Sequence, residues 1–516
     1  MVLEQLNQGD LATVCRVGKY VRSIAEPCLY THIELEQEGV GRSIAPLIST
    51  FLRRPKLAEH TRSLSIGAHN GCGPTWANRE LPSETPTIGD VCKTRTDEFV
   101  ACVNAMHVDF EHLWIQNLTK GALDAFISLL VSRLPNLQWL DLYDGAAKQT
   151  VVLGKMFSSA LCSPRGHENS SFPKFHQLRD VYLQPGLPTG PDDYGNTADI
   201  LSLLYLPALR TLAAKLDNPL FFRWPCDTMP ECHNLTSLDL DGVREGMLGR
   251  LLSRTKNLRT LHWEWTYDPN VYELDPTMGG NLAIQLSHHS APIINLGQIV
   301  TDLSNVQTTL KSLSVTAECE WRWDGVYPWL GVQGSLKLLA TFECLTELQI
   351  PLVFLVGFFR NSQRQLGQYI PKSVELLILN NSLCYDQCTW TTASVCRLIQ
   401  TWLKKGRVPT SKLRQITLVD TIYATAEVPI DQVRNLKLLT KMCKIGMSVG
   451  LSMVALHSSQ MDYATDLEGE GFVGEIAGLY LGCGFVYNGC IPSLEDSNLQ
   501  DENSEDDDLE DEDKTL

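Results

Sequence analysis

The sequence predicts an α/β fold in which short parallel strands and helices alternate along a right-handed solenoid, with the strands inside and the helices outside. The first observation is a six-residue phrase with apolar residues at its first, fourth and sixth positions. Clear copies of this phrase begin at Leu137, Leu235, Leu258, Leu310 and Leu345. Because apolar and variable residues alternate, each copy predicts a short strand that buries its apolar side. The second observation is an apolar stripe at helical spacing before some of the phrases, as in residues 122–131.

The phrase L-x-x-L-x-L is typical of leucine-rich repeats. We take the second apolar anchor of each phrase as its marker, and the markers are Leu64, Leu113, Leu140, Val181, Leu212, Leu238, Leu261, Leu313, Leu348, Leu377 and Ile416. Several gaps between markers lie near the usual repeat length of about 20–29 residues, and the longer gaps leave room for insertions. A repeat array builds a one-dimensional core and presents a long surface, so this pattern favours a binding protein over an enzyme.

Four segments follow from the phrases and the composition. Residues 1–35 are expected to form a short helical segment, and residues 36–457 one solenoid of repeats. Residues 458–493 are expected to cap the C-terminal end of the solenoid. Residues 494–516 are acidic and almost free of apolar side chains, which predicts a disordered tail.

Composition and charge exclude several classes of partner. The chain has 516 residues, 44% hydrophobic and 20% charged, and a formal net charge of -17. Much of this charge lies in the tail, so the mildly acidic body gives no reason to expect nucleic acid or membrane as a partner. The apolar stretch at residues 350–359 is too short to span a bilayer. Without a visible secretory signal, the 16 scattered cysteines predict reduced thiols in the cytoplasm or nucleus.

The first 35 residues follow a different pattern. Asp10 is a suitable N-cap for a helix, and Gly18 interrupts the helical pattern before a second short helix that Pro27 ends. An extended stretch follows at residues 33–35. The apolar and aromatic residues of this segment that could contact a partner are Leu11, Val14, Val17 and Tyr20.

Residues 10–30, which read DLATVCRVGKYVRSIAEPCLY, resemble the second half of a fungal F-box. Residues 47–64 resemble the link that joins such F-boxes to their leucine-rich repeats. The Leu-Pro pair and first helix of the family's F-box have no counterpart here, and Gly18 replaces a capping serine, so we expect a partial F-box. The resemblance implies a Skp-type adaptor as partner and a non-catalytic, substrate-binding subunit of a ubiquitin ligase. The alternatives are that residues 1–35 only cap the repeats, and that the chain is a scaffold without a ligase link.

Two short motifs raise the possibility of an enzyme. Residues 446–450 match the nucleophile elbow of α/β-hydrolases, but we expect a helix before Ser448 and a strand after it, the reverse of the required order. Residues 469–474 match a dinucleotide fingerprint, but they lack a preceding strand. The pairs at residues 192–193 and 288–289 are interpreted as solvated loop residues. We therefore expect no catalytic residues, no cofactor and no metal.

Side chains that flank the buried positions of each strand point to the concave face of the solenoid. Several of them are acidic or aromatic, a combination that suits a basic protein substrate through charge attraction and cation–π contact. The alternative is ordinary polar decoration of a solvated sheet. The residues selected for the patch are Trp114, Trp139, Asp141, Tyr143, Asp180, Tyr182, Asp239 and Asp241. A loop with Trp321, Trp323 and Trp329 is the next candidate surface.

Overall fold

The structure is a computed structural model. It describes residues 3–36, 40–67, 95–143, 146, 150–162, 172–184, 200–216, 223–267, 269, 292–319, 327–359, 365–383, 388–404, 412–420, 452–457 and 487–488.

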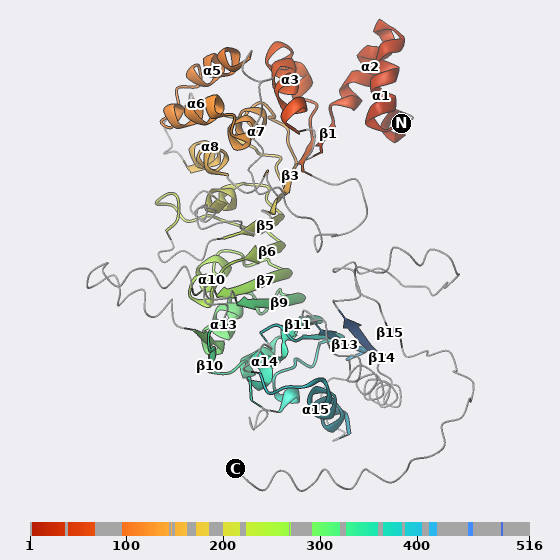
Figure 1. Ribbon diagram of the computed structural model, residues 1–516, viewed down its shortest axis with the longest axis vertical. Coiled ribbons are helices and arrows are strands. Elements are labelled where there is room, and N and C mark those ends of the chain that lie inside the picture. Colours follow the sequence, from red (N-terminus) through yellow and green to blue (C-terminus); the bar gives the residue numbers. More distant parts are fainter. Residues whose placement is uncertain are drawn as a thin grey trace, which may run out of the picture.

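A large sheet runs through the described part of the chain, and its strands follow one another in sequence order (Figure 1). Its strands are β1 (His32–Leu35), β2 (Ser63–Ile66), β3 (Trp139–Tyr143), β4 (Asp180–Gln184), β5 (Thr211–Lys215), β6 (Ser237–Asp241), β7 (Thr260–Tyr267), β9 (Ser312–Cys319), β11 (Glu347–Pro351), β12 (Leu376–Asn380), β13 (Gln415–Asp420), β14 (Ser452–His457) and β15 (Tyr487–Asn488). All neighbours pair in parallel except β14 and β15, which are antiparallel. A small parallel pair consists of β8 (Ile293–Asn295) and β10 (Gly331–Gln333).

Most of the helices lie along one side of the sheet, and α1 and α2 lie apart from them (Figure 1). The α-helices are α1 (Gln8–Val17), α2 (Lys19–Leu29), α3 (Val40–Arg53), α4 (Pro55–Ala58), α5 (Thr96–Asn104), α6 (Glu111–Lys120), α7 (Leu123–Val131), α8 (Val151–Cys162), α10 (Glu245–Leu252), α13 (Leu296–Leu303), α14 (Leu352–Val356) and α15 (Thr392–Lys404). Short 3-10 helices occur at Leu3–Gln5 (η1), Leu201–Tyr205 (η5), Ser304–Val306 (η6), Lys337–Thr341 (η7) and Leu366–Gln368 (η8). The predicted α/β class with parallel strands is therefore confirmed.

The markers of the repeat phrase form one continuous row across the sheet. Leu64 pairs with Leu140, and the row continues strand by strand to Leu377 and Ile416. The exception is Leu113, which lies on α6 and not on a strand. The strand expected after Ser448 is confirmed in its described part as β14, and residues 448–451 lie outside the described residues.

A repeated hydrogen-bond pattern keeps the strand starts aligned although the repeats differ in length. The carbonyl of Arg62 accepts the backbone N–H groups of Gln138 and Trp139, at 2.8 and 3.0 Å. The carbonyl of Gln138 in turn accepts those of Arg179 and Asp180, and the same arrangement recurs as far as β13. Length differences are therefore taken up by the connections between strands and do not shift the register.

The core lies between the sheet and its helices. Leu140, Leu238 and Leu261 are at most 2% exposed, and the residues two positions further along each strand are buried beside them. This alternation is the period of two expected for a sheet that is covered on one face.

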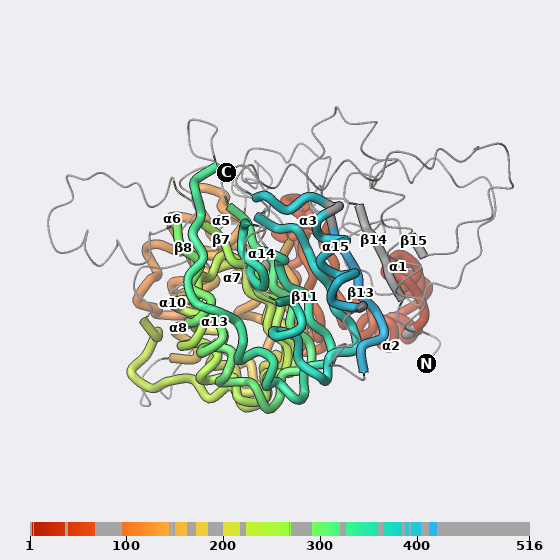
Figure 2. The backbone as a smooth tube through the Cα atoms, turned by 90° about the horizontal axis from the view of Figure 1, so that it is seen from below, coloured from red at the N-terminus to blue at the C-terminus, as the bar shows by residue number. Residues whose placement is uncertain are grey.

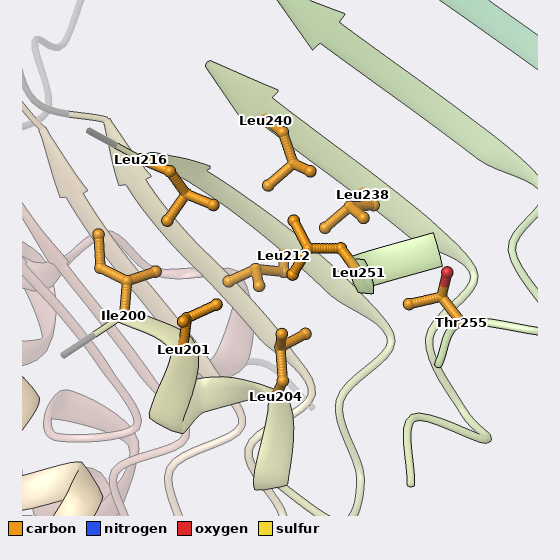
Figure 3. Close-up of a pocket in the computed structure, with 9 residues that line it drawn as sticks. All are labelled: Ile200, Leu201, Leu204, Leu212, Leu216, Leu238, Leu240, Leu251 and Thr255. Atoms are coloured by element: carbon orange, nitrogen blue, oxygen red, sulfur yellow. The ribbon is translucent and has the colours of Figure 1, made fainter. Parts of the chain in front are cut away.

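A small apolar cavity of about 10 Å³ lies in the core under β5 and β6 (Figure 3). Its lining is Ile200, Leu201, Leu204, Leu212, Leu216, Leu238, Leu240, Leu251 and Thr255. The cavity has room for about one water molecule, and apolar cavities of this kind stay dry. The cavity is therefore a packing defect and not a ligand site.

A charged pair is buried within the core on the helix side of β7. The guanidinium of Arg244 lies 5.2 Å from the centroid of the Trp265 ring and 5.5 Å from that of Tyr267. The Glu245 carboxylate lies 3.2 Å from the Arg244 guanidinium and accepts a hydrogen bond of 2.7 Å from Trp265 Nε1. Glu245 also accepts the backbone N–H of Asn295 at 3.2 Å, which ties β8 to this cluster. The pair is satisfied within the fold and has a structural role.

Helices α1 and α2 form a hairpin at the first edge of the sheet, beside β1 and away from α8, α10 and α13 (Figure 2). The carboxylate of Glu26 is 8% exposed and accepts two hydrogen bonds of 2.6 Å from Arg54, which precedes α4. The Tyr30 ring meets the Phe51 ring edge-on, with centroids 5.6 Å apart. These contacts fix the hairpin to the body of the protein.

Several sequence features lie outside the described residues. They are the motifs at residues 446–450 and 469–474, the pairs at residues 192–193 and 288–289, Trp321 and Trp323, and the tail from Glu495 onward. Among the helices that the structure does describe, none is both long and apolar enough to cross a membrane.

Candidate functional site

The face of the large sheet opposite the helices carries the side chains that alternate with the core residues, and we call it the open face. The register gives the order of these side chains across the sheet. One row runs from Asp141 to Tyr182, Ala213, Asp239 and His262 on five neighbouring strands. The predicted aromatic and acidic residues of β3, β4 and β6 therefore do share one face.

One end of this row is aromatic, and we call it the aromatic end; it consists of Trp139, Asp141, Tyr143 and Tyr182. Trp139, Asp141 and Tyr143 alternate along β3, and Tyr182 is the neighbour of Asp141 on β4. The rings of Trp139 and Tyr182 lie with their centroids 4.7 Å apart and their planes at 31°. Trp139 is 37% exposed, so one ring of this end is open to a partner.

Asp141 lies between Trp139 and Tyr143 on this face of β3 and is only 6% exposed. Its Oδ1 atom is buried and has no hydrogen-bond partner among the described residues. Burial raises the pKa of Asp141 to about 6, and hydrogen bonding from the side chains of Tyr143 and Trp139 opposes the increase. No cationic side chain of the described chain contributes to this pKa. Asp141 is therefore a buried carboxyl group that lacks a countercharge in this part of the protein.

The other end of the open face is acidic, and we call it the acidic end; it consists of Asp239, Asp241, Glu264 and Glu318, with Lys215 and His262 beside them. The single lysine lies across from Asp241, and His262 Nε2 lies 3.9 Å from Asp239 Oδ1. Negative groups therefore outnumber positive ones at this end.

Crowding and burial perturb the carboxyl groups of the acidic end. Burial raises the pKa of Asp239 to about 6, partly offset by His262. Burial, together with the charges of Asp241 and Glu318, raises the pKa of Glu264 to about 8. Burial also raises the pKa values of Asp241 and Glu318. A cation brought to this end would relieve the unfavourable charge, because it would stabilise the ionised carboxylates.

Three of these side chains could also hold a metal ion. The ligand atoms of Asp239, Asp241 and His262 lie within 4.8 Å of one another. Two carboxylates and an imidazole form a donor set that divalent transition metals accept. The same negative charge suits a basic side chain equally well.

The structure corrects the position of one predicted patch residue. Trp114 was expected on the concave face, but it lies on α6, is fully buried, and donates a 2.9 Å hydrogen bond from Nε1 to the carbonyl of Ala125. Its ring stacks on that of Phe110, with centroids 5.6 Å apart. Trp114 is therefore a core residue and is removed from the candidate site. The exposed Trp329 remains a separate surface residue, 72% exposed.

Other members of the predicted patch are placed as expected, and some site residues were not selected from the sequence. Asp180 is half-buried at the start of β4, next to Trp139. The acidic end also includes Glu264 and Glu318, which are cross-strand neighbours of Thr316 and Thr266. A signal for Glu318 exists in the sequence, because apolar residues continue to alternate to the end of β9, beyond the six-residue phrase.

The helical hairpin presents a second candidate surface. Val17 is 74% exposed, Tyr20 79% and Ile24 48%. Tyr20 and Ile24 are four residues apart on α2, so they lie on one face of that helix. Val14 is half-buried. Leu11, which was expected to offer apolar surface, is 5% exposed and packs within the protein, so that expectation was wrong.

Comparison of the chain with protein-family models and with curated proteins finds no match.

Proposed function

We propose that this chain is a right-handed leucine-rich-repeat solenoid that recognises a protein partner with the open face of its sheet. The observation that carries the proposal is the composition of that face from β3 to β9. Exposed or half-buried aromatic rings lie at one end and an excess of carboxylates at the other. A face that served only for solubility would not need large aromatic side chains or partly desolvated acids.

The chemistry of the open face favours a basic partner. Lys and Arg side chains are attracted by the negative groups and can also lie over the faces of Trp and Tyr rings. Exposed charges are screened over about 8–10 Å near physiological ionic strength, so binding should weaken as salt is added. Electrostatic attraction of this kind mainly accelerates association and selects the partner.

Cross-linking in cell extract followed by binding measurements on purified protein tests this function. The variants are Trp139→Ala at the aromatic end and the paired Asp239→Lys, Asp241→Lys change at the acidic end. A matched control is Asp109→Asn, which removes an exposed charge from the loop between α5 and α6. Both site variants should bind the captured partner more weakly, and the control should bind like the wild type. Equal binding by all four folded proteins would place the recognition site elsewhere.

We further propose that the protein is the substrate receptor of a Skp-cullin-F-box-type ubiquitin ligase. The resemblance of residues 10–30 to part of an F-box motivates this role, and the exposed Val17, Tyr20 and Ile24 favour it. An apolar surface on a helical hairpin suits an adaptor protein. The alternative is a repeat scaffold that uses the same open face without any link to a ligase.

Capture of a purified Skp-type adaptor distinguishes the receptor from the scaffold. The wild type should retain the adaptor, and a Val17→Asp, Tyr20→Ala variant should lose it. Phe359→Ala is the control, because it removes a similarly exposed apolar residue, 52% exposed, outside the hairpin. If the wild type fails to bind the adaptor, or if the hairpin variant binds as well as the control, the scaffold is the better description.

A further inference from the structure

We infer that the aromatic end and the acidic end are two subsites for two basic side chains of one extended partner segment, spaced about four residues apart. The inference rests on the proposed function, because it describes what the open face would recognise. Asp141 and the neighbouring rings of Trp139, Tyr143 and Tyr182 form the first subsite. Asp239 and its acidic neighbours form the second.

The burial of Asp141 carries the first step. A carboxylate that is 6% exposed and has a buried oxygen without a hydrogen-bond partner is costly unless a positive group compensates it. The described part of the chain brings Arg54 to Glu26, but it brings no lysine or arginine to Asp141. A cation from a partner would supply the missing charge.

The aromatic rings next to Asp141 provide the contact surface for that cation. Trp139 and Tyr182 pack against each other, and Tyr143 lies on the same face of β3. The faces of aromatic rings attract Lys and Arg, and Trp is the strongest of them. A cation placed on the exposed ring of Trp139 would also interact with the neighbouring Asp141 carboxylate, in partly desolvated surroundings. Ring and carboxylate therefore act on the same guest.

The register gives the spacing between the subsites. Asp141 and Asp239 lie in one row and are separated by three strand-to-strand steps, through Tyr182 and Ala213. Neighbouring strands are about 4.8 Å apart, so the separation is about 14 Å. An extended chain advances about 3.3–3.6 Å per residue, so about four residues cover this distance.

Fluorescence anisotropy with labelled nine-residue peptides tests the inference on the full-length protein. The probes contain serine and glycine with two arginines that are either four positions apart or adjacent, and a third probe has one arginine. Matching lysine peptides show whether guanidinium geometry matters. The peptide with the spaced pair should bind about tenfold more tightly than the single-arginine peptide. The peptide with the adjacent pair should gain much less affinity over the single-arginine peptide. Asp141→Asn, which preserves side-chain shape, should reduce the affinity for the spaced pair to that for the single arginine.

The control Asp109→Asn should bind all peptides like the wild type. Equal affinities for spaced and adjacent arginines, or an Asp141→Asn variant that binds the spaced pair like the wild type, would overturn the two-subsite inference. The proposed function would survive that result if Trp139→Ala still weakened binding of the cross-linked partner. If Trp139→Ala had no effect on that partner either, both proposals would fail.

Discussion

Replacing Asp141 by Asn should stabilise the protein at neutral pH. The carboxyl group is 6% exposed, its Oδ1 atom has no partner in the described structure, and burial raises its pKa from 3.8 to about 6. An ionised Asp141 therefore makes the folded state less stable than a neutral side chain of the same shape would. Most substitutions of buried residues destabilise a protein, so a stabilising one is a specific expectation.

The magnitude and the sign follow from linkage between protonation and folding. The difference between 3.8 and about 6, at about 1.4 kcal/mol per pH unit, corresponds to at most about 3 kcal/mol. Because the pKa of the folded state is the higher one, the cost is absent below pH 4 and grows as the pH rises to about 6. Above that pH it is fully present. The Asn amide must also find partners, so we expect a net gain of about 1–2 kcal/mol.

Urea unfolding followed by far-ultraviolet circular dichroism measures this effect between pH 4.5 and 7.5. The difference in unfolding free energy between Asp141→Asn and the wild type should increase from pH 4.5 to about pH 6 and then level off towards pH 7.5. Other titrating groups are common to both proteins and cancel in the difference. Asp109→Asn should show no such trend. A variant that is less stable than the wild type at pH 7.5, or a difference that does not change with pH, would refute the reasoning.

Three further predictions concern the stability of other parts of the protein. Glu245→Gln should lower the unfolding free energy by about 3–5 kcal/mol in urea unfolding, because it replaces the carboxylate that is paired with the buried Arg244 guanidinium by a neutral amide. Leu238→Ala should cost about 2–5 kcal/mol in the same assay and enlarge the cavity beside it, whereas an exposed control such as Leu338→Ala, 58% exposed, should cost little. Hydrogen bonds from Arg54 lower the pKa of Glu26 below 4.5, so its stabilising effect is present above that pH and is lost as the pH falls. The hydrogen-exchange protection factors of α1 and α2, which correct for the intrinsic pH dependence of amide exchange, should therefore fall on acidification, and they should fall less in Glu26→Gln.

The parallel sheet was predictable because the alternation of apolar and variable residues in the repeat phrase indicates which side chains are buried. Leu64, Leu140 and Leu238 each sit between variable residues, and the alternation alone assigns them to a covered face. Their pairing in one row follows from stacking equivalent positions of successive units. The longer gaps between some markers did not change the pairing of the strands.

The prediction for Trp114 was wrong because the sequence around it fits two hydrophobic patterns, the alternation of a strand and the spacing of a helix. Leu113 and Ile115 flank Trp114 in a way that imitates a strand, but both are only half-buried. The buried residues are Trp114 and Leu118, four apart, which is the spacing of a helix face. Gly121 ends that helix with a positive φ of 77°. A glycine directly after Lys120 is a signal in the sequence for the end of a helix, and it is stronger evidence for a helix than a short alternating run is for a strand.

The properties of the open face could be predicted only in part. That Asp141 and Asp239 share a face follows from the phrase. Asp141 is buried next to Tyr182 of the following strand, and the crowding of Glu264 depends on Glu318, which lies more than fifty positions away in the chain. Effects of this kind depend on cross-strand neighbours, and a single sequence does not specify their distances or their exposure.

Two buried carboxylates of this chain differ in a way that bears on function. Glu26 receives two short hydrogen bonds from Arg54, and its pKa falls. Asp141 is buried to a similar degree, but no described cation approaches it and its pKa rises. The first arrangement stabilises the fold, whereas the second costs stability, and such costs persist where a binding or catalytic task requires them. The contrast singles out Asp141, more than the half-buried acids around Asp239, as the position where a stabilising substitution and a loss of binding should coincide.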